Sequence, residues 1–339
     1  MDIDHASRFE PGTDPVTPTI AVLIPCLNEE AGIASVVQDF RAALPQARLF
    51  VYDNNSSDRT VEQARRAGAI VRSERRPGKG NVVRRMFADV DADIYVLVDG
   101  DGTYEAATAP ALIDRLVTDE LDMVCGARAA TSHDAYRSGH QFGNAMLTGL
   151  AAHIFGGHLK DMLTGYRALS RRFVKTFPAL SEGFEIETEL TIHALELRLP
   201  IAELPTPYRE RPRGSSSKLR TYRDGARIFA TIFHLIKEEK PLQFFSGVFL
   251  ALAAAAIAIM IPVFITYYQT GLVPRFPTAI LATSIVMLAF LSLVCGLVLE
   301  TVTRGRRETK RILYLMHPAS AAPFGTSGAL AERTLKVRS

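Results

Sequence analysis

Two long uncharged stretches near the C-terminus constrain the fold of this chain more than any other feature. No charged residue occurs at 241–274, and none occurs at 276–299. A bilayer core is about 30 Å thick and is crossed by about 20 apolar residues in a helix, so either stretch can span it. Two buried core helices are the alternative, but core helices rarely stay uncharged over such lengths. We therefore predict a membrane segment at 241–303, with transmembrane helices at about 244–268 and 277–300.

Basic residues lie on the outer side of both stretches and indicate which way the hairpin faces. They include Lys218, Arg220, Arg223, Lys237 and Lys240 before the first stretch, and Arg304, Arg306, Arg307, Lys310 and Arg311 after the second. Because short loops rich in Lys and Arg stay in the cytoplasm, we predict a multi-pass protein of the inner or plasma membrane with both termini cytoplasmic. The net charge of +3 is too small to indicate a nucleic-acid partner.

The rest of the chain divides into a folded domain and shorter segments. Residues 1–18 are polar and lack the apolar stretch of a signal peptide, so we expect a loose tail. Residues 19–220 alternate short apolar runs with amphipathic stretches, which predicts an α/β domain. Residues 221–240 have apolar side chains at helical spacing and form either an ordinary core helix or an interfacial helix at the bilayer surface. Residues 304–339 are expected to form a basic cytoplasmic tail.

The apolar runs of the α/β domain predict strands that alternate with helices. The expected strands are 20–24, 47–52, 69–71, 94–98 and 121–125, and the expected helices are 31–43, 58–67, 79–89 and 107–117. This alternation predicts a Rossmann-like, mostly parallel sheet with helices on both faces. Ligands of such sheets bind beyond the carboxyl ends of the strands, so the loops there are the candidate site.

The turn after the strand at 94–98 carries two aspartates in the order Asp99-Gly100-Asp101-Gly102-Thr103. Residues two apart in an extended chain point to the same side, with about 7 Å between their Cα atoms, so Asp99 and Asp101 can converge on one cation. Oxygen ligands favour Mg²⁺ or Mn²⁺, and Mg²⁺ is usually held by one or two carboxylates together with substrate phosphates. The alternative is a polar turn without a ligand, because Asp-Gly is a common turn sequence.

Polar loops also follow the first two predicted strands. Asp53 ends the second strand, and the run from Pro25 to Glu29 leaves the first. Carboxylates at this edge can accept hydrogen bonds from a base or a ribose. Ser57 or Asp58 could instead cap the following helix. Three polar loops at one edge of the sheet predict a nucleotide site.

Cationic loops occur in the second half of the domain, at Arg128, at Arg167 and at 211–218. Arginine is suited to bidentate phosphate recognition and lysine to point-charge contacts. Any one of these arginines could equally form a surface salt bridge. The segment 211–218 is the strongest phosphate candidate because its small, flexible residues lie just before the juxtamembrane helix. Three alternating acids fit the polar face of a strand, a helix start or a sugar site, and they are Glu185, Glu187 and Glu189.

Four motifs in a fixed order carry a resemblance to a known family: Ile24 to Glu29, Asp53 to Thr60, Gly78-Lys79-Gly80 and Asp99-Gly100-Asp101. They resemble the family 2 glycosyltransferases of GT-A fold, in the branch that contains dolichyl-phosphate mannose synthase and the bactoprenol-phosphate glycosyltransferases with two membrane helices. The resemblance runs from about Thr19 to Arg311. It implies metal-dependent, inverting transfer of a sugar from a nucleotide-sugar to a polyprenyl phosphate for the cell envelope, and a homotetramer.

The resemblance also implies roles for individual residues. The nucleotide site would be lined by Pro25, Asn28, Glu29 and Asp53, with Lys79 near the base or the phosphates. Mg²⁺ or Mn²⁺ would be held by Asp99 and Asp101, with Thr103 where related enzymes often carry glutamine. Phosphate binding falls to Arg128, Arg167, Arg211 and Lys218, and the sugar or acceptor site to Asp161.

Two positions depart from the family pattern, and two other functions compete with the one that it implies. Leu27 stands where an aromatic residue often stacks on the base, and Asn54 replaces a second aspartate, so uracil and guanine both stay open. A processive polysaccharide synthase usually has a Gln-x-x-Arg-Trp segment, whereas this chain has no Trp. A non-catalytic membrane adaptor would not need the intact pair of Asp99 and Asp101. The sequence leaves the sugar itself undetermined.

Overall fold

The computed structural model describes residues 18–130, 161–183, 185–209 and 240–318, together with the single positions 149 and 237. Contacts between Cα atoms divide the chain into two units. The described parts of these units are an α/β domain and a helical hairpin. The predictions for the N-terminal tail, the juxtamembrane helix at 221–240, Arg211 and Lys218 lie outside the described residues.

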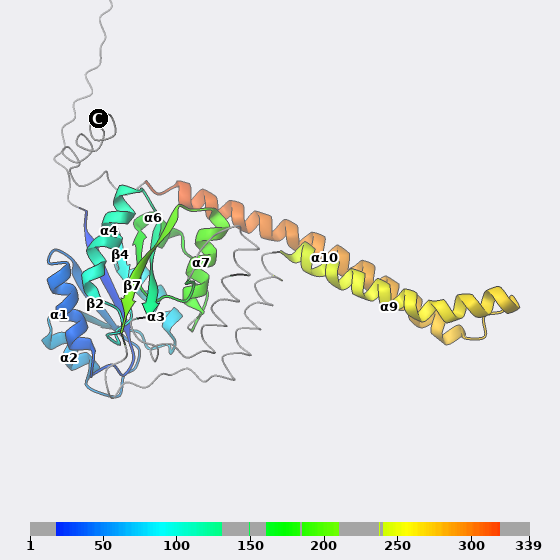
Figure 1. Cartoon of the computed structure of the whole chain (residues 1–339), viewed down its shortest axis with the longest axis horizontal. Helices are drawn as coiled ribbons and strands as arrows, with labels where there is room; N and C mark the ends of the chain where they lie inside the picture. The colour runs from blue at the N-terminus through cyan, green and yellow to red at the C-terminus, as the bar shows by residue number, and fades with distance from the viewer. Residues whose placement is uncertain are drawn as a thin grey trace, which may run out of the picture. The chain divides into compact units, whose positions relative to one another are not determined.

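A mostly parallel seven-stranded sheet forms the centre of the α/β domain (Figure 1), with the order β3-β2-β1-β4-β6-β5-β7. The strands are β1 (Ile20–Cys26), β2 (Arg48–Asp53), β3 (Ile70–Ser73), β4 (Ile94–Leu97), β5 (Met123–Ala130), β6 (Arg167–Ser170) and β7 (Ile201–Tyr208). Only β6 runs antiparallel to its neighbours β4 and β5. The predicted sheet type is confirmed, while β6 and β7 were not predicted and β5 is longer than expected.

Helices cover both faces of this sheet, as the buried strands require (Figure 1). They are α1 (Ile33–Ala43), α2 (Thr60–Arg66), α3 (Lys79–Asp89), the 3₁₀ turn η1 (Ala106–Thr108), α4 (Ala109–Thr118), α6 (Arg171–Thr176) and α7 (Ile186–Leu197). Val22 and Val96 belong to the apolar core that includes α1 and α4. On the opposite face, Tyr95 meets Phe87 of α3 edge to face. Successive residues of one strand thus enter different layers, which explains why β1 and β4 contain no charged residue.

Pro25 lies inside β1, although we expected this strand to end at Ile24. The carbonyl of Leu23 accepts from Val98 on the β4 side, and the carbonyl of Cys26 accepts from Asn54 on the β2 side. Alternate residues of a strand direct their backbone groups to the same neighbour, so Pro25 faces the β4 side. The pairing with β4 already ends at Leu23 and Leu97. The missing N–H of proline therefore removes no ladder hydrogen bond, and β1 continues to Cys26.

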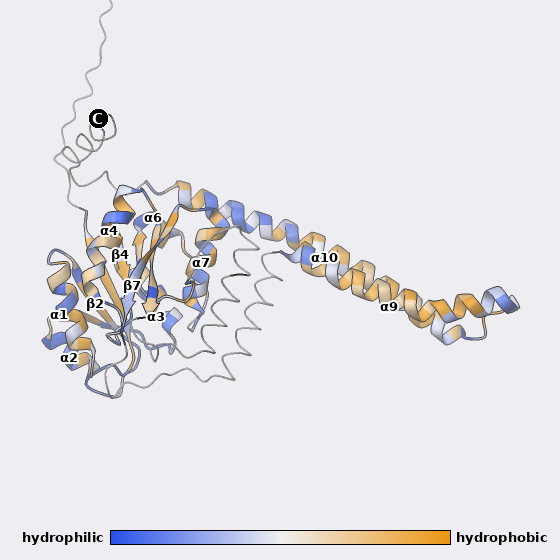
Figure 2. Ribbon diagram, in the orientation of Figure 1, coloured by the Kyte–Doolittle hydropathy of each residue, from blue (hydrophilic) through white to orange (hydrophobic). Residues whose placement is uncertain are grey.

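The second unit contains a hairpin of two long helices, α9 (Pro241–Thr270) and α10 (Phe276–Leu315). The helices pack closely, because a Cβ added at Gly296 would lie 2.7 Å from Cβ of Phe245. Figure 2 shows apolar residues along most of both helices. Many of these side chains are exposed, among them Leu250, Ile257, Phe264, Met287 and Leu291. Both helices are long and apolar enough to cross a bilayer, and this exposure points to membrane association.

Both helices are longer than we predicted, and the difference is largest at the end of α10. We expected this helix to end near residue 300, but it continues through the basic segment to Leu315. Glu, Arg, Lys and Leu are good helix formers, and no proline interrupts the chain between 278 and 317. Forty residues of helix are about 60 Å long at 1.5 Å per residue, twice the thickness of a bilayer core. The first part of the predicted tail is therefore helical.

Candidate active site

Side-chain hydrogen bonds join the loops after β1 and β2 at the carboxyl edge of the sheet. Asn28 has a left-handed backbone with φ of 53°, which asparagine adopts more readily than most residues. Its backbone N–H donates to Oγ of Ser56 at 2.9 Å, and its Oδ1 accepts from the backbone N–H of Ser57 at 2.8 Å. The backbone N–H of Glu29 donates to Oγ1 of Thr60 at 2.8 Å. Asn28, which we predicted at the nucleotide site, therefore holds the two loops together.

Carboxylates from three loops gather around the end of β1, where Cys26 is buried. Burial raises the pKa of the Cys26 thiol, and the negative charges of Glu29, Asp53, Asp99 and Asp101 raise it further. The structure thus brings together the acidic residues of the polar loops that follow β1, β2 and β4. A bound cation would relieve the repulsion among these charges.

Asn54 organises the next loop of the site through its side-chain amide. Its Nδ2 donates to the carbonyl oxygens of Glu74 at 2.9 Å and Arg76 at 2.7 Å. Its Oδ1 accepts from the backbone N–H of Gly78 at 2.7 Å. An ionised aspartate has no hydrogen to donate, so it could not make the two bonds to carbonyl oxygens. The departure from the family pattern at this position therefore has a structural reason, which is to hold the loop in front of α3.

Two glycines allow the loop at 181–183 to pack against the start of α3. Gly78 has φ of +119°, and a Cβ there would lie 3.1 Å from the carbonyl carbon of Glu182. A Cβ at Gly80 would lie 2.7 Å from the carbonyl carbon of Ser181. The backbone N–H of Gly80 donates to the carbonyl of Glu182 at 3.0 Å. This close approach of backbone to backbone places the start of α7 beside Lys79.

Lys79 forms a buried ion pair with two carboxylates that come from different elements. Its ammonium donates to Oδ1 of Asp99, which follows β4, and to Oε1 of Glu187 in α7 at 2.5 Å. Burial by itself lowers the pKa of Lys79, but the two carboxylates outweigh burial and raise it above the usual range. The side chain therefore stays charged in the folded protein. We expected Lys79 near the base or the phosphates, and the structure places it directly on one of the predicted metal ligands.

Asp101 is held in one orientation by Thr103. Oδ1 of Asp101 accepts from Oγ1 of Thr103 at 2.6 Å and from its backbone N–H at 3.1 Å. Within the described ranges, no cluster of three or more His, Cys, Asp or Glu side chains could hold a metal. Asp99 and Asp101 fit the binding mode in which two carboxylates hold the cation and substrate phosphates complete its coordination. Thr103 orients one of these carboxylates.

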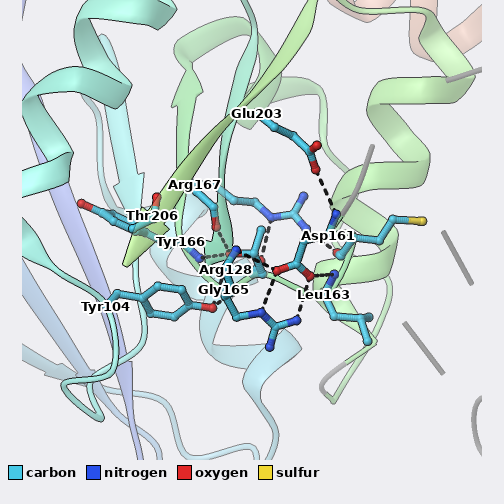
Figure 3. Close-up of polar contacts among 12 residues, drawn as sticks. Tyr104, Arg128, Asp161, Leu163, Gly165, Tyr166, Arg167, Glu203 and Thr206 are labelled. Atoms are coloured by element: carbon cyan, nitrogen blue, oxygen red, sulfur yellow. Dashed lines mark hydrogen bonds and ion pairs between the residues drawn. The ribbon is translucent and has the colours of Figure 1, made fainter. Parts of the chain in front are cut away.

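Gly165, in the loop before β6, lies against the carboxylate of Asp99. A Cβ at this position would lie 2.8 Å from Cγ of Asp99 and closer still to Oδ2. The backbone N–H of Gly165 donates to the hydroxyl of Tyr104 at 2.9 Å (Figure 3). The loop before β6 can approach the Asp99 carboxylate this closely only because residue 165 has no side chain.

Arg128 and Asp161 form a bidentate ion pair next to this loop. Nε and Nη2 of Arg128 donate to the two carboxylate oxygens of Asp161, each at 2.7 Å (Figure 3). The backbone N–H of Asp161 donates to Oε1 of Glu203 at 3.0 Å. Burial alone raises the pKa of Asp161, but the hydrogen bonds and charge of Arg128 outweigh it, so the pKa is lowered. Arg128, which we predicted to bind a phosphate, is therefore paired with Asp161, which we predicted at the sugar or acceptor site.

Arg167 lies in the core of the domain, which corrects our prediction that it binds a phosphate. Its side chain is fully buried at the start of β6. Its three nitrogens donate to Thr164 O, Met123 Sδ, Thr191 Oγ1, Met162 O and Glu187 O. A guanidinium has five N–H donors, and these contacts use all of them. Arg167 thus ties the loop before β6 to the start of α7 and has no donor left for a ligand.

Glu187 is a site residue, but the sequence left open whether it lies on the polar face of a strand, at a helix start or in a sugar site. The helix-start alternative was right for this segment, since α7 begins at Ile186 with Glu185 in the capping position. Glu187 then points to Lys79, and Glu189 accepts from the backbone N–H groups of Leu180 and Ser181. Lys79 and Glu187 are 108 positions apart in the chain. No local pattern links residues so far apart, so only the folded structure identifies this pair.

The fold and the acidic edge of the sheet define a class, the glycosyltransferases of GT-A fold. The model of the family "Glycosyl transferase family 2" matches residues 21–177. Glycosyltransferase AglJ of Haloferax volcanii is 35% identical over 247 residues, which are 72% of this chain and 81% of that protein. The dolichyl-phosphate hexose transferase of the same organism is 31% identical over 221 residues, 65% of this chain and 95% of that protein. The chain belongs to the family 2 glycosyltransferases.

Solved structures agree with this assignment. Glucosyl-3-phosphoglycerate synthase from Mycobacterium tuberculosis, in complex with Mn²⁺, uridine diphosphate and glucosyl-3-phosphoglycerate, superposes with a TM-score of 0.54. It is 26% identical, and the match covers 66% of this chain and 80% of that chain. The same enzyme has been solved with Mg²⁺ and uridine diphosphate. The GT-A fold that we predicted is confirmed, and the protein is a glycosyltransferase that carries a hairpin of two apolar helices.

Proposed function

We propose that this protein transfers a hexose from a nucleotide-sugar to a polyprenyl phosphate of the undecaprenyl or dolichyl type. The observation that carries this proposal is the combination of the acidic edge at Asp99 and Asp101 with an exposed apolar hairpin in one chain. A relative that aligns with 65% of this chain is named a dolichyl-phosphate hexose transferase, which supports a lipid phosphate as the acceptor. A product carried by such a lipid would serve the assembly of a cell-envelope glycan.

Asp99 and Asp101 are proposed to hold Mg²⁺ or Mn²⁺ together with the diphosphate of the donor. Bound there, the cation supplies positive charge against the negative charge that develops on the leaving diphosphate. Thr103 bonds the carboxylate of Asp101 and sets its orientation, and Lys79 bonds the carboxylate of Asp99. Pro25, Glu29, Asp53 and the loops fastened by Asn28 are proposed to form the nucleotide site, where carboxylates accept hydrogen bonds from base or ribose.

The acceptor phosphate needs no general base. A phosphate monoester has its second pKa near 6, so it is already largely ionised at neutral pH. The task of the protein is then to position two anions and to balance their charge. Arg128, oriented by Asp161, is a proposed phosphate contact in the described part of the chain. Arg211 and Lys218 are further proposed contacts, and direct displacement at the anomeric carbon would invert its configuration.

The basic residues beside both uncharged stretches support a topology in which the α/β domain and both termini are cytoplasmic. In this arrangement the α/β domain and the lipid phosphate meet at the same leaflet. A homo-oligomer formed through the exposed hairpin is part of the proposal, because apolar helix faces are available for packing against other copies.

One experiment tests the reaction directly. The full-length protein in detergent is incubated with undecaprenyl phosphate, a panel of UDP- and GDP-sugars and Mg²⁺, and the lipid is weighed by mass spectrometry. We expect a mass increase of one hexose with one donor, and no product from undecaprenol, which lacks the phosphate. Asp101→Asn should abolish the product, whereas Asp114→Asn on the exposed side of α4 should not. Transfer to undecaprenol, or full activity of Asp101→Asn, would contradict the proposal.

A further inference from the structure

One ammonium lies between two carboxylates at the centre of the site. The Nζ atom of Lys79 forms ion pairs with the carboxylates of Asp99 and Glu187. The side chains of Lys79 and Glu187 are 9% and 8% exposed, whereas that of Asp99 is 29% exposed. The pair formed with Glu187 is therefore the buried one, and the contact with Asp99 lies at its accessible side.

We propose that Lys79 balances the charge of Asp99 in the metal-free protein, and that Glu187 is the positioning residue that retains Lys79 when Asp99 takes up the divalent cation. This inference rests on the metal role of Asp99 in the proposed function. It assigns Glu187 an effect on cation affinity although Glu187 itself is no ligand of the cation.

Electrostatics makes the two cations compete for Asp99. A carboxylate that already bonds an ammonium presents less negative charge to a second cation, and two positive charges at one carboxylate repel each other. Lys79 must therefore weaken its contact with Asp99 when a cation binds there. Moving a buried ammonium away without a new partner would leave a charge uncompensated in the interior, which is strongly unfavourable. Glu187 removes this penalty, because it already bonds the same nitrogen.

The backbone around Glu187 is built to stay in place during this exchange. Its carbonyl oxygen accepts from Nη2 of Arg167 at 2.9 Å and from Oγ1 of Thr191 at 3.1 Å. The loop that precedes it is fastened to α3 by the bond from Gly80 to Glu182. Glu187 and Lys79 thus sit on two helices that are tied together, and the Asp99 contact is the one that can change.

The arrangement makes cation binding depend on the donor. Without the donor, Lys79 lowers the affinity of Asp99 and Asp101 for a divalent cation. The diphosphate of a nucleotide-sugar brings further negative charge, which favours the cation at Asp99. The protein would then gain its cation together with the donor rather than before it.

Titration of the metal-free, full-length protein with Mn²⁺ in detergent tests this inference without any turnover. Free Mn²⁺ is followed by electron paramagnetic resonance, in the absence of donor and acceptor. Lys79→Met should tighten Mn²⁺ binding about tenfold, and Glu187→Gln should weaken it about tenfold, both within the usual range of coupling between two binding events. In the double variant the affinity should equal that of Lys79→Met, because Glu187 acts only through the ammonium. Lys175→Met is a matched change, because this ammonium donates to the carbonyls of Phe87 and Val90 and pairs with Asp91, and it should leave the affinity unchanged.

The directions of these effects separate the inference from a purely structural role. If both residues merely supported the fold, both single variants would weaken Mn²⁺ binding, and this result would overturn the inference. An equal loss from Glu187→Gln in the Lys79→Met background would overturn it as well, since Glu187 would then act on the cation directly. If Lys79→Met fails to fold, the double variant provides the same comparison because it removes both charges of the buried pair. If wild type binds Mn²⁺ no better than Asp101→Asn does, the metal assignment in the proposed function fails instead.

Discussion

Replacing Arg167 with methionine is expected to destabilise the α/β domain rather than to weaken the binding of a phosphate. The change removes five hydrogen bonds at a fully buried position and leaves carbonyl groups of the loop before β6 and of α7 with fewer donors. A buried polar group that loses its partner costs about 1–3 kcal/mol, and breaking a buried charged network costs about 3–5 kcal/mol. Methionine fills part of the space, and the hydroxyl of Thr191 can still donate to the carbonyl of Glu187 or of Met162. We therefore expect a loss of about 3–5 kcal/mol.

Thermal unfolding of the purified protein, followed by circular dichroism, measures this loss. In a domain of about 150–250 residues, 1 kcal/mol shifts the unfolding temperature by about 2–4 °C. The expected decrease for Arg167→Met is therefore roughly 6–20 °C. Arg66→Met is a matched control, because the Arg66 side chain is 69% exposed and its ion pair with Glu62 lies on the surface of α2. Exposed pairs contribute about 0–1 kcal/mol, so the control should unfold within a few degrees of wild type.

The opposite outcome would refute this reasoning. If Arg167→Met unfolds at the wild-type temperature and raises the KM for the lipid acceptor, the guanidinium contacts the phosphate. The hydrogen bonds that we assign to the core would then not describe the working protein. A large loss of stability with an unchanged acceptor KM in the remaining folded fraction supports the structural role.

Further predictions concern the metal ligands and a buried thiol. Gly165→Ala should displace the Asp99 carboxylate and lower Mn²⁺ affinity about tenfold or more with an unchanged unfolding temperature; a clear loss of stability with normal affinity would contradict this. Thr103→Val should reduce turnover about 10–100-fold, because Asp101 loses the hydroxyl that orients it. Kinetics at saturating Mg²⁺ measure this reduction, and an unchanged rate would contradict the role of Thr103. Burial raises the pKa of Cys125 to about 11, so it should resist iodoacetamide at pH 8 in the native protein and react in guanidinium chloride. Rapid native modification, read by peptide mass spectrometry, would show that this thiol is accessible.

Local sequence signals were sufficient for most elements of the α/β domain. The helix predicted at 79–89 agrees with α3 at both ends. Pro77 and Gly78 mark its start, because neither residue favours a helix interior. The buried strands β1 and β4 were recognisable from runs without charge, since helices cover both faces of the sheet. The acidic loops after β1, β2 and β4 were recognisable because parallel strands place their carboxyl ends at one edge.

Other features depended on contacts between distant residues and were missed. β6 and β7 complete the sheet through pairings with β4 and β5 that no local pattern announces. The end of α10 was missed for a different reason, because charged helix formers continue a helix as readily as apolar ones do. The change from apolar to charged residues along α10 predicts where the helix leaves the bilayer. It does not predict where the helix ends.

The sequence by itself determined the class of the fold, the two apolar helices and the acidic residues of the site, because each of these follows from properties repeated over neighbouring residues. Only the tertiary structure decided what the individual charges do. Arg128 and Arg167 look equivalent in the sequence as loop arginines. In the structure Arg128 pairs with Asp161 beside the site, whereas Arg167 is fully buried in the core. The role of a charged side chain depends on the partners and the burial that it meets in the fold, and these are set by residues far away in the chain.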